Sequence, residues 1–383
     1  MYCDLYLPFP TSTPGAGPSS NNAIKKGKGK ATAAPVEQKS QSCWEGVGSK
    51  EKEEVDKVFA LAGHLGYTVI ANSVPSIRST SVPLSPFSSQ VPHPTLDPRY
   101  SDNATGSRRL VQLSRVTITL DDSSQHGLNA VNSAALSSYD IIAVIPTTAN
   151  AFSNACLKLS EPGPNQVSII SLPLHQNHRM PFFAKRSLVK TALRNGAVFE
   201  IPYAQALGTS DPSLSRKYRQ NFLINAREVI RVVLAVSGGG GRDGTTGNRG
   251  KGGGGIIFSS GVDVTGSMAG VGMRSPADLI NLAVMLGMPS NQAKDAIAFT
   301  PRAVLLKAQA RKAHKGVTAV PRMVAGQESQ PDHDIVPLTE ETRQGEQDEK
   351  GSKRRTRDEG DEEQRLEAAQ PAKRKKAKAQ TKA

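Results

Sequence analysis

Apolar and polar positions follow two alternating periods along the chain, and these periods predict strands and helices in regular succession. Short β-branched or wholly apolar runs predict seven strands, at 2–8, 67–71, 115–120, 140–145, 167–172, 198–201 and 256–260. Apolar residues spaced three and four positions apart predict helices between them, at 51–65, 124–136, 149–159, 185–195, 214–236, 275–287 and 300–311. Sustained β-α-β-α order is typical of a parallel sheet.

The ends of two predicted helices carry strong local signals. Ser275 is placed to cap a helix that begins with Pro276, and Gly287 follows its end. Gly196 is placed to end the preceding helix at Asn195. The nearly all-apolar run from Asp140 to Ile145 indicates a strand that is buried on both faces, as strands of parallel sheets are.

Three polar stretches interrupt this succession. Segments 10–50 and 74–107 are rich in Pro, Ser and other polar residues, and 237–254 is rich in glycine. We expect all three to be disordered insertions in a single domain that spans 1–320. The remaining body is slightly shorter than the roughly 250 residues of a TIM barrel. A doubly wound sheet would also fit, and the pattern alone does not separate the two folds.

The positive charge of the chain lies in this body. The formal net charge is +14 over 383 residues, yet the tail at 321–383 holds 14 basic and 14 acidic residues. We expect that tail to be disordered. A basic folded body suits a polyanionic partner such as a nucleic acid. Two basic clusters in the tail predict a nuclear address: Lys353, Arg354 and Arg355, and Lys373, Arg374, Lys375 and Lys376.

Residues that could carry catalysis do not form a convincing set. Carboxylates at predicted strand ends are Asp4, Asp121, Asp122, Asp140, Glu200 and Asp263, and none has an obvious histidine partner. The histidines and the three cysteines lack metal-binding spacing. A glycine-rich match at Gly239–Gly244 has a helix before it instead of a strand. The Asp263–Ser267 loop resembles a metal motif and follows a strand, but that motif normally opens its domain and here it lies late in the chain. The sequence therefore argues against a self-sufficient enzyme.

Basic residues near the expected sheet edges give the positive signal. Arginine can bind phosphate with its forked guanidinium and can stack on bases. Tyr218 lies between Lys217 and Arg219, an arrangement that suits combined stacking and charge contact. We expect RNA contacts from Arg216, Lys217, Arg219, Arg274 and Arg302, and then from Arg115, Lys185, Arg186, Arg311 and Lys312.

The ordered segments resemble the thirty-kilodalton subunit family of ribonuclease P. The matching stretches keep the family order: LAGHLGYTVIA (61–71), SRVTITL (114–120), YDIIAVIP (139–146), MPFFAKRSLVKTALRNGAVFEIPY (180–203), SRKYRQNFLINAREVI (215–230), IIFSSG (256–261), MRSPADLINLAVMLGM (273–288) and TPRAVLLKAQARK (300–312). No single stretch is diagnostic, but the ordered set is specific. The three insertions depart from the compact family pattern and suggest a eukaryotic, fungal-like member.

The resemblance implies a TIM-like barrel of about seven parallel strands, similar to the polymerase-and-histidinol-phosphatase barrel. Those enzymes carry an H-x-H pair on the first strand, whereas the strand here reads Asp4-Leu5-Tyr6-Leu7-Pro8. The resemblance therefore implies a non-catalytic subunit with no catalytic or metal-binding residues of its own. No cofactor is expected on the protein, and magnesium is expected on the RNA.

The same resemblance implies a place in a nuclear and nucleolar complex. Expected partners are the ribonuclease P RNA, a small ferredoxin-like protein and other basic subunits, with precursor tRNA bound indirectly. Expected roles are removal of the 5′ leader of precursor tRNA and, through the related MRP ribonuclease, processing of ribosomal RNA. Two alternatives stay open on sequence: a metal-dependent phosphoesterase on the same barrel, and a scaffold that binds only proteins.

Overall fold

The computed structural model describes residues 1–10, 43–44, 47–76, 82–87, 90–100, 109–122, 126–207, 211–237, 254–262 and 269–314. The glycine-rich insertion from 238 to 253 and the predicted tail lie outside these residues, as do most of the first insertion and both basic clusters.

A seven-stranded, wholly parallel sheet forms the centre, with its strands in the order of the chain. They are β1 (Cys3–Pro8), β2 (Val69–Ser76), β3 (Val111–Leu120), β4 (Ile141–Pro146), β5 (Ile169–Ser171), β6 (Val198–Pro202) and β7 (Ile256–Ser259). The segment after β7 returns to β1, where the Gly261 amide donates to the Tyr6 carbonyl at 2.9 Å. The sheet therefore curls into a TIM-like barrel, as predicted, and is not an open doubly wound sheet.

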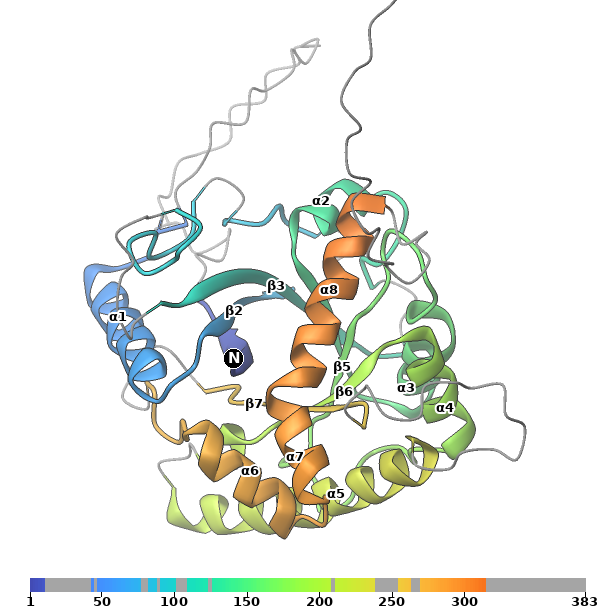
Figure 1. The fold of residues 1–383 in the computed structure, drawn as a ribbon. Helices are drawn as coiled ribbons and strands as arrows, with labels where there is room; N and C mark the ends of the chain where they lie inside the picture. Colours follow the sequence, from blue (N-terminus) through green and yellow to red (C-terminus); the bar gives the residue numbers. More distant parts are fainter. Residues whose placement is uncertain are drawn as a thin grey trace, which may run out of the picture. The chain divides into compact units, whose positions relative to one another are not determined.

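Helices cover the outside of this barrel (Figure 1). They are α1 (Ser49–His64), α2 (Ser133–Ser138), α3 (Ala149–Asn154) with a π-helical turn η1 (Ala155–Leu159), α4 (Arg186–Asn195), a 3₁₀ turn η2 (Ala204–Ala206), α5 (Pro212–Ser237), α6 (Pro276–Met285), α7 (Ser290–Ile297) and α8 (Phe299–His314). In Figure 1, α8 runs from α7 across the strands to α2. The predicted caps form: Ser275 accepts from the Asp278 amide, and Gly196 adopts a left-handed φ of 87°.

Alternate side chains of each strand divide the core in two. One set faces the helices and joins the large outer core, for example Val116, Val144 and Phe199. The other set faces the barrel axis. Its first layer is apolar, with residues such as Val69, Ile141 and Ile257, and Val304 of α8 packs against it. The end of the barrel at which the strands begin is therefore sealed by α8.

The prediction for the second insertion is wrong over most of its length. Val82, Phe87 and Val91 are buried, and Asp97 is fully buried with bonds to Arg99 and to the Gln112 amide. These apolar residues lie in turns and extended segments, so they bury individually without any helical or strand period. Strand β2 also runs into this segment, as far as Ser76.

The first insertion also has a packed part near its end. Trp44 contacts Phe9 at a ring distance of 5.3 Å, and Cys43 and Val47 are buried.

Two helical predictions need correction. Among the described residues of the predicted helix at 124–136, helix begins only at Ser133 and continues to Ser138. The Asn-containing part before it turns, because Asn132 bonds to Asn129 and to the Gly127 carbonyl. Helix α7 was not predicted, since its eight residues span about two turns and give too short a pattern to recognise.

Candidate nucleic-acid interface

An ion pair occupies the barrel axis above the apolar layer. Arg115 of β3 binds Glu200 of β6 through two bonds of 2.7 Å, and neither side chain has any exposed surface. The guanidinium also donates to the Thr117 hydroxyl at 2.9 Å and to the Leu5 carbonyl at 2.5 Å. Ser259 of β7 donates to Glu200. The pair thus links β1, β3, β6 and β7 across the interior.

Arg115 was expected to contact RNA, and its complete burial makes that assignment wrong. Arg115 was counted among the basic residues near the sheet edges, but its side chain lies on the interior face of β3. The carboxylate that neutralises it, Glu200, was noted in the sequence only as a candidate acid or base. A usable signal existed, because two opposite charges each lie within an apolar strand and buried charges must pair.

A second buried carboxylate joins the seam between the first and last strands. Asp4 accepts from the Ser260 amide at 3.0 Å and from the Tyr6 amide at 3.2 Å. Burial raises the pKa of Asp4 to about 6, against the opposing effect of these hydrogen bonds, and the nearby Glu200 adds to the increase. Asp4 therefore acts within the fold of the barrel, where it joins two elements that the sheet ladder does not pair.

A cavity of about 290 Å³ opens above the ion pair, at the end where the strands finish. Its lining includes Tyr6, Ser171 and Pro202 from strands β1, β5 and β6, and His175 and Tyr218 from a loop and from α5. TIM-type barrels place their functional sites at this end.

The cavity has an aromatic wall and a firm floor. The His175 and Tyr218 rings meet edge to face with centroids 5.2 Å apart. The Arg115 guanidinium lies 4.3 Å from the centre of the Tyr6 ring and supports it from the barrel interior.

The loop at one side of this cavity is held by two asparagines of α5. Asn221 donates to the His175 carbonyl at 3.0 Å, and Asn225 donates to the Leu174 and Asn177 carbonyls at 2.8 and 2.9 Å. Both asparagine side chains are buried. Their role cannot be recognised from sequence, because an asparagine inside a helical pattern gives no sign of which carbonyls it will contact.

The basic residues of α5 and α4 lie mainly in solvent. Arg216, Lys217, Lys185 and Arg186 are exposed, as expected for phosphate contacts. Arg219 is exposed too, but its guanidinium bonds back to Ser215, one turn earlier on α5.

Arg219 and Arg274 do not line the cavity at the mouth of the barrel; they line a groove of about 540 Å³ between α5 and α6. Its lining is largely apolar and includes Phe222, Leu223 and Leu282.

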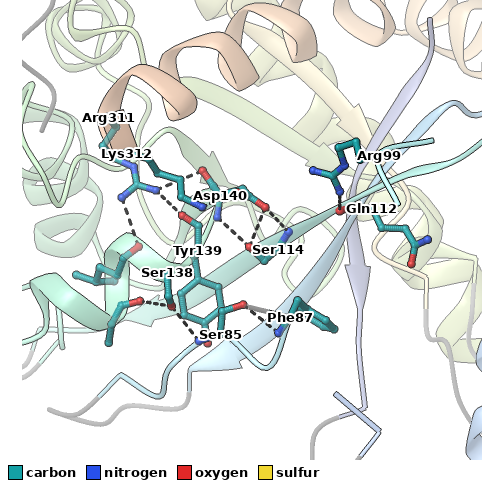
Figure 2. Close-up of polar contacts among 12 residues, drawn as sticks. Ser85, Phe87, Arg99, Gln112, Ser114, Ser138, Tyr139, Asp140, Arg311 and Lys312 are labelled. Carbon is teal, nitrogen blue, oxygen red and sulfur yellow. Dashed lines mark hydrogen bonds and ion pairs between the residues drawn. The ribbon is translucent and has the colours of Figure 1, made fainter. Parts of the chain in front are cut away.

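The three predicted residues of α8 belong to the opposite end of the barrel. Figure 2 shows Arg311 and Lys312 directed at the segment that precedes β4. Arg311 is buried and donates to the Tyr139 carbonyl at 2.6 Å and to the Pro164 carbonyl at 3.1 Å. Lys312 pairs with Asp140 at 2.8 Å, and Asp140 also accepts from the Ser114 amide.

The expected RNA contact of Arg311 is therefore wrong, because its guanidinium is enclosed by backbone carbonyls. Burial lowers the pKa of Arg311 to about 10, so it stays charged at neutral pH. Arg302 is exposed on α8, near Cys3 at the beginning of β1. The predicted contacts thus do not form one surface: those of α4 and α5 lie apart from those of α8.

The remaining sequence candidates do not assemble into a catalytic group. Asp122 accepts from Thr148, and His64 is exposed at the end of α1. Asp263 lies outside the described residues. Within the described ranges, no three His, Cys, Asp or Glu side chains come together in a way that could hold a metal ion. In the same part of the chain, no helix is both long enough and apolar enough to span a membrane.

Fold and site together define a parallel α/β barrel whose interior carries a buried ion pair and whose mouth is lined by aromatic and amide side chains. The family described as RNase P subunit p30 matches residues 1–238. The chain therefore belongs to the RNase P subunit p30 family.

Similar proteins include Protein GAMETOPHYTE DEFECTIVE 1 of Arabidopsis thaliana, 29% identical over 70% of this chain. The chain spans 42% of that relative's length. Ribonuclease P protein subunit p30 of Mus musculus is 26% identical, and the match covers 67% of this chain and 81% of the mouse protein. Among solved structures, a chain of archaeal ribonuclease P with mature tRNA aligns at a TM-score of 0.43 and 14% identity, over 73% of this chain and 96% of the archaeal chain.

Proposed function

We propose that the protein is a non-catalytic subunit of ribonuclease P that binds and stabilises the catalytic RNA for removal of the 5′ leader from precursor tRNA. The family match over residues 1–238 carries this proposal. The net charge of +14 supports RNA as the partner. In this assembly the RNA and its magnesium ions would carry out hydrolysis.

Exposed cations on α4 and α5 support a backbone-binding surface at the mouth of the barrel. Lys185, Arg186, Arg216 and Lys217 are exposed to solvent. Contacts from such side chains neutralise phosphates without reading sequence, which is the task of a subunit that holds a folded RNA.

The apolar groove between α5 and α6 supports a protein partner beside the RNA. Leu223 is 45% exposed although it lines this groove, and Arg219, Arg274 and Asp278 surround it with charge. An apolar centre with a polar rim is the usual anatomy of a protein interface. We assign the groove to the small ferredoxin-like subunit expected from the family resemblance.

The same resemblance extends the proposal to the MRP ribonuclease and to ribosomal RNA processing in the nucleolus. Nuclear entry would depend on the clusters Lys353–Arg355 and Lys373–Lys376. The phosphoesterase alternative gains no support, since the first strand reads Asp4-Leu5-Tyr6-Leu7-Pro8 and lacks the H-x-H pair of those enzymes.

The decisive experiment is purification of the tagged full chain from its own cells, followed by cleavage of precursor tRNA before and after digestion of the bound RNA. We expect leader removal that is lost on digestion. Cleavage that survives digestion would transfer the chemistry to the polypeptides and overturn the proposal. Sequencing of the bound RNA would show whether MRP RNA accompanies ribonuclease P RNA.

A further inference from the structure

The cavity at the mouth of the barrel has the size and lining of a site for one small planar group. Its volume of about 290 Å³ lies at the lower limit of ligand pockets. Gln176 and Gln205 contribute amides, each with both donors and an acceptor, and Ser171 contributes a hydroxyl. Among the described lining residues there is no Asp or Glu, so nothing in this lining repels an anionic ligand or neutralises a cationic one.

One polar atom of the wall is left without a partner. The Nδ1 atom of His175 is buried and makes no hydrogen bond within the described part of the chain. Burial lowers the pKa of His175, so its imidazole is neutral at physiological pH and offers one donor and one acceptor. A buried polar atom without a partner is uncommon in folded proteins, and a ligand is one of the explanations for it.

The wall is also fixed before any ligand arrives. Asn221 and Asn225 hold the backbone of the 174–177 loop, and the Arg115 guanidinium supports the Tyr6 ring. A site that is already ordered loses little conformational entropy on binding. On α5, the exposed Lys217 immediately precedes Tyr218.

We propose that this cavity receives one unpaired nucleobase of the bound RNA, which stacks on Tyr218 and hydrogen-bonds to the amides of Gln176 and Gln205. This inference rests on the proposed RNA-binding function and names the part of the RNA that the mouth recognises. Unstacked bases are bound in this way, on aromatic rings and through their polar edges, whereas paired bases of an RNA helix are inaccessible to such a cavity.

The test uses the full chain and two labelled probes: a single-stranded RNA of about eight nucleotides and a blunt RNA duplex. Affinities are measured over a series of salt concentrations for wild type, Tyr218→Ala and Tyr218→Phe. Tyr100→Ala is the matched control, because Tyr100 is an exposed tyrosine of another segment. Gln176→Ala changes an exposed side chain, so it tests the cavity at little risk to the fold.

We expect Tyr218→Ala to weaken single-strand binding by roughly 5- to 100-fold, the effect of losing one base–aromatic stack. The slope of log affinity against log salt should stay unchanged, because no phosphate contact is lost. Tyr218→Phe and Tyr100→Ala should bind like wild type, Gln176→Ala should weaken single-strand binding, and duplex affinity should be equal in all variants.

Two results would overturn the nucleobase site without affecting the proposed RNA binding. One is an equal single-strand affinity of wild type and Tyr218→Ala, and the other is an equal loss of affinity for duplex and single strand in Tyr218→Ala. The variant Arg216→Glu/Lys217→Glu tests the proposed RNA binding separately. It should weaken both probes and flatten the salt dependence. Failure of wild type to bind either probe would instead count against RNA binding itself.

Discussion

Removing the carboxylate of the interior ion pair should destabilise the protein severely. In Glu200→Gln the side chain keeps its shape, but the Arg115 guanidinium remains buried with full charge and no counter-charge. One of its two 2.7 Å bonds would then face an amide NH₂, which is also a donor. The remaining bonds to Thr117 and to the Leu5 carbonyl supply dipoles but no negative charge.

The size of the effect follows from the burial of both partners. Removing one member of a fully buried pair costs about 3–5 kcal/mol, because the other charge is left uncompensated. For a domain of this size, each kcal/mol lowers the melting temperature by about 2–4 °C. We therefore expect Glu200→Gln to melt roughly 6–20 °C below wild type.

Urea and thermal unfolding, followed by circular dichroism and by the fluorescence of the single tryptophan, Trp44, would measure this loss. Glu228→Gln is the matched control, since Glu228 pairs with Arg231 on the surface, where the two side chains are 45% and 72% exposed. An exposed pair of this kind contributes at most about 1 kcal/mol.

A double variant tests the reasoning independently. Arg115→Met/Glu200→Leu removes both charges together, so no uncompensated charge is left inside and most of the stability should return. Equal melting temperatures for Glu200→Gln and Glu228→Gln would refute the argument. So would a double variant that is less stable than Glu200→Gln.

Three further predictions concern Asp4, Arg311 and Gly196. The raised pKa of Asp4, about 6 against an ordinary 3.8, means that its contribution to stability is present below about pH 4 and is lost as the pH rises through 6. Between pH 4 and pH 8, the free energy of unfolding of Asp4→Asn in urea should therefore rise relative to that of wild type by up to about 3 kcal/mol. Parallel pH profiles of the two proteins would contradict this. Arg311→Met should lower stability by about 1–3 kcal/mol, because backbone carbonyls lose their donor. In a binding titration, RNA affinity and the slope of log affinity against log salt should stay unchanged. A flatter slope would show that Arg311 does contact RNA. Gly196→Ala should lower stability by about 1–2 kcal/mol in thermal unfolding, because the φ of this residue is +87°. Adding Lys307→Ala to this variant removes the side chain next to the new Cβ, and backbone strain predicts that stability is not restored.

The parts of the fold that sequence predicts are those in which one local pattern is sufficient. The apolar run of β4 needs burial on both faces wherever it lies, and the Ser275–Pro276 pair begins a helix regardless of its neighbours. The packed part of 82–100 was missed for the opposite reason. Its buried residues follow no period, and contacts with distant parts of the chain fix their position, such as the hydrogen bond that the Gln112 amide donates to Asp97.

The site shows the same division between local and distant information. Tyr218 and its basic neighbours were found from sequence because they are adjacent on one helix, whereas Arg115 was misplaced because its partner lies 85 residues away. A charged residue in a strand indicates that its side chain faces solvent only if the sheet has an open face. Once seven strands close into a barrel, both faces are buried, and a group that stays charged inside needs a partner such as the Glu200 carboxylate, which lies on another strand.

Closure of the barrel also makes its two ends different, and this difference determines at which end the proposed RNA could enter a cavity. Where the strands begin, Val304 of α8 packs against the apolar layer, and the Arg311 guanidinium donates its hydrogen bonds to backbone carbonyls. Where the strands finish, the neutralised Arg115–Glu200 pair forms a floor that leaves no net charge beneath the Tyr6 ring. In the proposed assembly, the attraction for RNA at that end would come from the rim, where Arg216 and Lys217 are exposed, and the proposed preference for unpaired bases would come from the cavity.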